Sequence, residues 1–178
     1  MQKYQDLINI FHECFFKSYN TELTLGGDEP LYQPADPSYP HHRIIFARGY
    51  FSSALHECAH WLIAGENRRK LLDFGYWYVP DGRSESEQSL FQQVEIKPQA
   101  MEWILSEAAG APFFVSIDNL FGNSSDSTVF KQAVYEQVKI YAEKGLPERA
   151  RIFREAIAQF YGRSKELSLD DFHLEALN

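Results

Sequence analysis

The spacing of hydrophobic residues predicts a chain built mainly of helices. Apolar side chains recur every three or four positions between residues 3 and 18, which places them on one face of an amphipathic helix. The same spacing predicts further helices at residues 52–64, 98–109, 128–144 and 147–160. Pro98 and Pro147 suit the first turns of two of these helices, because proline lacks an N–H that would be unpaired there.

Strands are expected in a smaller part of the chain. Residues 71–82 are rich in aromatic side chains and end in a Pro-Asp-Gly turn, which is typical of a strand. Residues 91–98 are expected to form its partner in a small sheet, and residues 43–48 a short strand or the entry to the next helix. Residues 25–42 carry four prolines and two glycines and are expected to form a long irregular loop. The pattern therefore predicts a helix-rich α+β fold with a small β-sheet.

Composition narrows the setting of this fold. With 178 residues, of which 44% are hydrophobic, the chain can bury one core, and residues 1–178 are expected to form one domain. The net charge of -8 argues against nucleic acid or an anionic membrane as the partner. No run approaches the roughly 20 apolar residues of a membrane span. Two cysteines without a Cys-x-x-Cys pair favour a reducing compartment, so we expect a soluble, cytoplasmic monomer.

One motif carries metal chemistry. His56, Glu57 and His60 form a His-Glu-x-x-His sequence inside the helix expected at 52–64. Residues four apart lie on the same helical face, so both imidazoles can face one cation such as zinc or iron. Glu57 lies beside that face and could act as a base on metal-bound water. The alternative is a pair of packed, hydrogen-bonded histidines without a metal. Because the motif lies inside a predicted amphipathic helix, we favour metal binding and expect a zincin-like metal helix.

Two histidines leave such a site incomplete, since most sites of this kind add a third protein ligand, often a carboxylate. The downstream candidates are Glu66, Glu95, Glu102 and Glu107. Glu95 lies between two apolar residues, where a buried carboxylate would need a strong partner. We therefore favour Glu95 as the third ligand, with Glu102 as the next candidate.

The motif by itself is compatible with two chemistries and with a structural metal. A zinc peptidase would use His56, His60 and a glutamate as ligands and Glu57 as its base. Two histidines and one carboxylate also form the metal site of non-haem iron oxygenases. A structural metal on a binding module is the third possibility. The spacing of the motif does not separate them.

Longer stretches of the chain resemble the bacterial elongation factor P hydroxylase family. These stretches are GDEPLYQPAD (27–36), HECAHWLIAG (56–65), LLDFGYWYVPDGR (71–83), VEIKPQAMEW (94–103), AAGAPFFVSIDNL (108–120) and EALN (175–178). They extend over almost the whole chain, and the longer ones are far more specific than the five-residue metal motif.

This resemblance implies a function and a set of site residues. The family hydroxylates the β-lysylated lysine of translation elongation factor P, which implies that protein as the partner. It implies a metal on His56, His60 and a downstream glutamate, which we place at Glu95, with Fe(II) as the metal and O2 as co-substrate. Zinc is expected only if the protein is a peptidase. A long cationic substrate side chain suits an acidic, aromatic-edged mouth, for which the loop residues Asp28, Glu29 and Tyr32 are the candidates.

Overall fold

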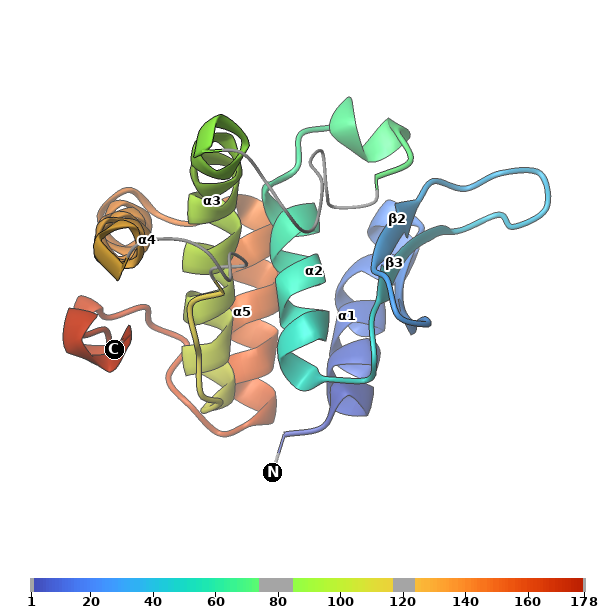
Figure 1. Cartoon of the computed structure of the whole chain (residues 1–178). Coiled ribbons are helices and arrows are strands. Elements are labelled where there is room, and N and C mark those ends of the chain that lie inside the picture. The colour runs from blue at the N-terminus through green and yellow to red at the C-terminus, as the bar shows by residue number, and fades with distance from the viewer. Residues whose placement is uncertain (1, 74–84, 117–123, 178) are drawn as a thin grey trace.

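The computed structural model describes residues 2–73, 85–116 and 124–177. In this part of the chain the fold is helix-rich α+β, with a three-stranded sheet (Figure 1). The longer elements are α1 (Tyr4–Tyr19), β1 (Thr21–Leu25), β2 (Leu31–Gln33), β3 (His42–Phe46), α2 (Phe51–Ile63), α3 (Glu85–Ala109), α4 (Ser124–Lys144) and α5 (Glu148–Phe160). A short 3-10 turn, η1 (Arg68–Lys70), lies between α2 and α3, and two more, η2 (Leu169–Asp171) and η3 (Leu174–Leu177), come after α5. None of the described helices is both long and apolar enough to cross a membrane.

The sheet is formed from residues near the N-terminus. Its order is β1-β3-β2, with β1 parallel and β2 antiparallel to β3. Ile44 and Phe46 alternate into the core along β3, as expected for a strand with one covered face. Of the two alternatives predicted for residues 43–48, the strand is confirmed, at 42–46. The irregular loop predicted at 25–42 is partly wrong because it contains β2.

The sheet predicted farther along the chain is not the one observed. The strand predicted at 71–82 lies mostly outside the described residues, although Asp73 makes an isolated bridge to Tyr32. The strand predicted at 91–98 is wrong, because these residues belong to α3. Pro98 lies inside that helix and not at its start.

The helix predicted at 98–109 is confirmed as the second half of α3, but the hydrophobic pattern missed the first half, and one buried face of the helix is polar. Glu95, Gln99, Glu102 and Ser106 are all buried and follow one another at helical spacing. A pattern that counts only apolar residues does not register such a face. An internal proline removes one backbone hydrogen bond, and tertiary packing of α3 against α2 and α5 offsets that cost.

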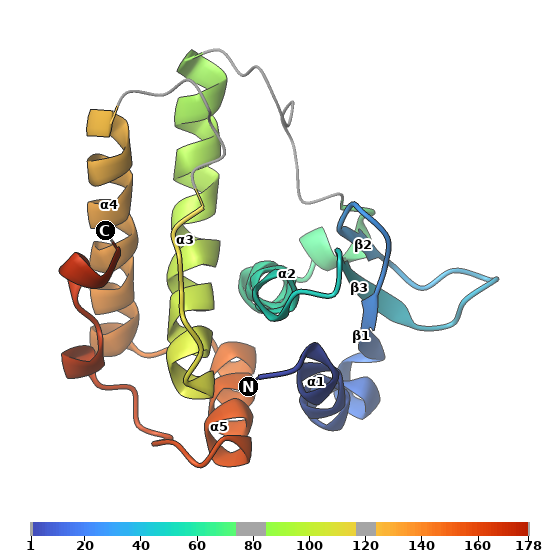
Figure 2. The same ribbon diagram turned by 60° about the horizontal axis from the view of Figure 1, so that its bottom comes forward.

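The helix α2 is held at the centre of the fold. Figure 2 shows α2 between α3 and the sheet, and Figure 1 shows it beside α1 and α5. Trp61 packs its ring 5.2 Å from that of Phe11 and 5.0 Å from that of Phe15. Phe153 on α5 contacts both phenylalanines. These aromatic contacts fix the rotation of α2, and its remaining face is directed towards α3.

Candidate metal centre

The polar face of α3 lies against the His-Glu-x-x-His face of α2. His56 and His60 stand one turn apart on α2, as their spacing predicts. Glu95, which is only 2% exposed, approaches both imidazoles from α3. One potential ligand atom from each of these three side chains lies within 4.8 Å of the others, which is an arrangement that could hold a metal ion.

The distances among these atoms are those of ligands around one cation. His60 Nε2 lies 3.1 Å from His56 Nε2 and 3.2 Å from Oε1 of Glu95, while His56 Nε2 lies 3.6 Å from Oε2 of Glu95. Ligands about 2.1 Å from a shared ion, at the angles of tetrahedral or octahedral coordination, stand roughly 3.0–3.4 Å apart. Two of the three distances fall in this range and the third exceeds it by 0.2 Å, so the three side chains could hold a small divalent metal after a minor adjustment of side chains.

Glu102 contacts the outer side of this cluster. Its Oε2 atom lies 2.8 Å from Nδ1 of His56 and is directed at the ring nitrogen that faces away from His60. An ionised carboxylate only accepts hydrogen bonds, so Nδ1 is the donor and Nε2 of a neutral His56 keeps its lone pair. Glu102 thus sets the ring orientation and tautomer of His56, as carboxylates behind metal-binding histidines do.

The close packing of these ionisable groups shifts the pKa values of Glu95 and His56. Burial raises the pKa of Glu95, but hydrogen bonds from His60 and Gln99 and the charges of the two imidazoles outweigh it and lower the pKa to about 2. Burial lowers the pKa of His56, but its hydrogen bond to Glu102 and the nearby carboxylates raise that pKa to about 10. A divalent cation would compete with the proton on His56 for the same lone pair.

Glu57 occupies a different position from the three clustered residues. It lines two hollows that both reach the cluster, and its carboxylate makes no hydrogen bond within residues 2–73, 85–116 and 124–177. Burial raises the pKa of Glu57, and the charges of Glu95 and Glu102 act in the same direction while the two imidazoles oppose them. A carboxylate with a raised pKa beside a reactive centre is suited to accepting and returning a proton.

The larger of the two hollows, called here the acidic cleft, has a volume of about 490 Å³. Its carboxylates are those of Asp28, Glu57, Glu95 and Glu102, and its other lining residues include Arg48, Tyr50, His56 and Phe114. The acidic cleft is therefore open to two of the three clustered residues.

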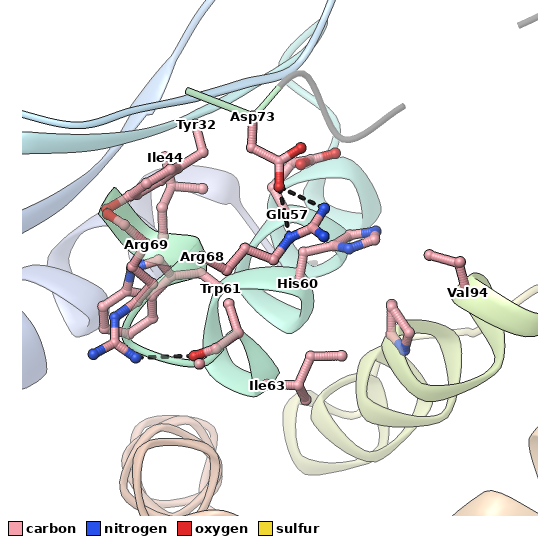
Figure 3. A pocket seen from close by; sticks show the side chains of 13 residues that line it. Tyr32, Ile44, Glu57, His60, Trp61, Ile63, Arg68, Arg69, Asp73 and Val94 are labelled. Carbon is pink, nitrogen blue, oxygen red and sulfur yellow. Dashed lines mark hydrogen bonds and ion pairs between the residues drawn. The ribbon is translucent and has the colours of Figure 1, made fainter. Parts of the chain in front are cut away.

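The other hollow, called here the small hollow, has a volume of about 230 Å³, and His60 and Glu57 are among its lining residues. Figure 3 shows Tyr32 and Ile44 of the sheet on one side of it and Val94 of α3 on the other. An ion pair between Arg68 and Asp73, with a shortest N···O distance of 2.7 Å, lies at its edge. Two separate hollows thus meet at the cluster.

The structure separates the residues that the sequence suggested for the substrate mouth. Asp28 lines the acidic cleft, Tyr32 lines the small hollow, and Glu29 lines neither. The hydroxyl of Tyr32 donates to the backbone oxygen of Arg69. The three residues do not surround a single opening, because β2 turns Tyr32 towards α2 while Asp28 precedes the strand.

Two of the candidate third ligands lie elsewhere. Glu66 forms an exposed ion pair with Lys70, at 2.9 Å. Glu107 binds Arg154 at 3.0 Å and Arg163 at 2.9 Å, and so belongs to a structural network. Of the four candidates, only Glu95 and Glu102 reach the histidines.

Gln99 is a site residue that sequence reasoning missed. Its side chain is buried one turn beyond Glu95, donates to the backbone oxygen of Ser116 at 2.8 Å and accepts from the Ser116 N–H at 3.0 Å. It therefore fastens the segment after α3 to the metal-facing side of that helix. The available signal was the helical spacing of Glu95, Gln99 and Glu102, which becomes visible once 91–98 is read as helix.

Comparison with known proteins identifies the family. The model of the family described as elongation factor P hydroxylase matches residues 10–172. A curated relative, the elongation factor P lysine hydroxylase of Haemophilus influenzae, is 58% identical over 175 residues, which cover 98% of each chain. A match of this length includes both the metal-facing helices and the segments around them. The chain belongs to the elongation factor P hydroxylase family.

Proposed function

We propose that this protein hydroxylates the β-lysylated lysine of translation elongation factor P. The observation that carries the proposal is the 58% identity to a protein named for that activity, which extends over nearly the full length of both chains. The cluster of His56, His60 and Glu95 supports it, because the reaction needs a centre that can bind a redox-active metal. The comparisons do not favour the zinc peptidase alternative.

His56, His60 and Glu95 would hold one divalent ion, proposed to be Fe(II). When bound there, iron would supply the activation of O2: one oxygen atom would enter a C–H bond, and the other would be reduced to water with two protons and two electrons from an external reductant. Three protein ligands leave coordination positions free for other molecules. The likeness to zincins that we propose is confined to the His-Glu-x-x-His helix.

The surrounding residues would orient and protonate the site. Glu102 holds the ring of His56 with Nε2 directed at the cluster. Glu57, which lies between the two hollows, is placed to move a proton beside the reacting atoms. Its raised pKa favours an exchangeable proton over a permanent charge.

The acidic cleft is the proposed entry for the substrate side chain. Its volume of about 490 Å³ is in the range of ordinary ligand pockets, roughly 300–1,000 Å³, whereas the small hollow is below that range. Its carboxylates complement the ammonium groups of a lysyl side chain. Asp28 has a side chain that is 93% exposed, so it would be the first charge of the cleft that the substrate meets.

We further propose that residues 1–178 act as one domain and as a monomer. Buried side chains from α1 through η3 belong to one continuous hydrophobic cluster, which ties the two metal-facing helices to the rest of the fold. Size-exclusion chromatography with light scattering should give a mass near 20.6 kDa.

Mass spectrometry of elongation factor P tests the function. In cells that lack this protein, the lysylated peptide should be lighter by one oxygen atom than in normal cells. The intact gene should restore the mass, and a His60→Ala variant should not. Unchanged masses in the deletion strain would refute the hydroxylase proposal, and new fragments of elongation factor P would point to the peptidase.

A further inference from the structure

Two exposed aromatic rings stand at the acidic cleft. The side chain of Phe114 is 79% exposed and that of Tyr50 is 63% exposed, and both line this cleft. Single exposed aromatic residues are common and need no explanation. Here two of them share one hollow with four carboxylates, which is the composition of a site for an alkyl chain that ends in a cation.

The fold holds both rings outward. Tyr50 is the residue that precedes α2, so its position is tied to the helix that carries His56. Phe114 lies between Phe113, which stacks on Trp103, and Val115, which packs against the core. This inward, outward, inward alternation leaves Phe114 on the surface.

Gln99 places Phe114 relative to the metal-facing residues. Its two hydrogen bonds to Ser116 fix the backbone two residues after Phe114. Gln99 also donates to Glu95, as the pKa lowering of that carboxylate reflects. The outer ring and the inner carboxylate are thus positioned by the same side chain.

We infer that Tyr50 and Phe114 form an aromatic clamp that holds the lysyl side chain of the substrate as it enters the acidic cleft. The inference rests on the proposed function for the identity of the substrate. The ring faces attract the ammonium group and cover the methylene groups, while the carboxylates deeper in the cleft draw the charge inward. Arg48 also lines the cleft, and its Nε atom lies 3.9 Å from a carboxylate oxygen of Asp28.

A small probe tests the clamp without elongation factor P. Nα-acetyl-lysine methylamide is titrated into the anaerobic protein, and the ring resonances of Tyr50 and Phe114 are followed by NMR. Both should shift, and the Nε-acetylated probe, which has no charge, should shift them far less. Probe binding that leaves both rings unperturbed would overturn the inference.

Variants then test the clamp with the protein substrate. Without O2, lysylated elongation factor P should bind Phe114→Ala and Tyr50→Ala about fivefold more weakly than the unaltered protein, and the double variant about 20-fold more weakly. Tyr50→Phe keeps the ring and should bind within about twofold. Phe160→Ala removes an exposed ring outside the cleft and should change nothing.

The outcomes separate the clamp from the function. Metal content should be equal in all these variants, since neither ring contacts the clustered histidines. Full affinity of the double variant, in a protein that still hydroxylates elongation factor P, refutes the clamp alone. Absence of hydroxylation by the unaltered protein refutes the proposed function, and the lysine probe still decides whether the clamp binds an alkylammonium group.

Discussion

His56 and Glu102 are joined by a contact of 2.8 Å between Nδ1 of the imidazole and Oε2 of the carboxylate. The contact joins residues 46 positions apart in sequence and so links α2 to α3, and it leaves the opposite ring nitrogen facing His60 and Glu95. Glu102 is therefore placed to support a metal ligand from behind, and Glu95 is placed to be a ligand itself.

Removal of Glu102 should weaken metal binding without abolishing it. Glu102→Ala frees the ring of His56 to rotate, and loss of such a supporting carboxylate typically lowers metal affinity about 10- to 100-fold. Competition with a chelator of known affinity measures the change. Glu66→Ala, which removes an exposed glutamate paired with Lys70, is the matched control. Equal affinity in both variants would show that the contact does not serve the metal.

Removal of a proposed ligand should have a larger effect. His60→Ala and Glu95→Ala should each purify with little metal, because two remaining ligands bind a divalent ion weakly. Far-ultraviolet circular dichroism should show that the helices are retained, since the core lies on the other faces of α2 and α3. Full metal occupancy in both variants would remove these residues from the site.

Glu57 should be required for turnover but not for metal binding. Glu57→Gln keeps the size and hydrogen-bonding capacity of the side chain but no longer exchanges a proton near neutral pH. We expect unchanged metal content and a rate of hydroxylation lower by about 100-fold or more, which is the usual contribution of a positioned acid or base. A rate within about threefold of the unaltered protein would assign Glu57 another role.

Asp28 and Glu29 offer a matched test of the substrate entry. Both are acidic and adjacent in sequence, but only Asp28 lines the acidic cleft. Asp28→Lys should raise the KM for elongation factor P about fivefold, more strongly at low salt, because charge at the rim of a site acts mainly on association. Glu29→Lys should change KM far less. Equal effects of the two reversals would indicate general repulsion and not entry through this cleft.

Arg154 should be important for stability. This buried residue on α5 donates to the carboxylate of Glu107 on α3 and to the backbone oxygens of Lys165 and Glu166. Arg154→Ala leaves the carboxylate of Glu107 without this partner and should lower the free energy of unfolding by about 3–5 kcal/mol. Arg151→Ala breaks an exposed pair on the same helix and should cost less than about 0.5 kcal/mol. Urea denaturation compares the two variants.

The sequence by itself determined the local part of the site. Four-residue spacing on a helix brings His56 and His60 to one face whatever surrounds them, because the helical repeat is set by the backbone. The helices at the two ends of the chain were also predictable, since their buried faces are apolar and recur at that repeat. The family resemblance and its implied function were carried by stretches such as VEIKPQAMEW, which are long enough to be specific.

Only the tertiary structure decided what completes the site. Glu95, Gln99 and Glu102 read as a strand followed by a helix because their helical face is buried but polar, and apolar periodicity does not detect a buried face of this kind. The packing of α2 against α3 distinguishes Glu95 from Glu102: one carboxylate meets both imidazole Nε2 atoms, and the other meets Nδ1 of His56. The sheet likewise depends on pairing between β1 and β3, which are about 20 residues apart, and such pairing energy is not present in any local stretch of sequence. The division of Asp28 and Tyr32 between two hollows has the same origin, because it follows from how β2 is paired and not from the identity of either residue.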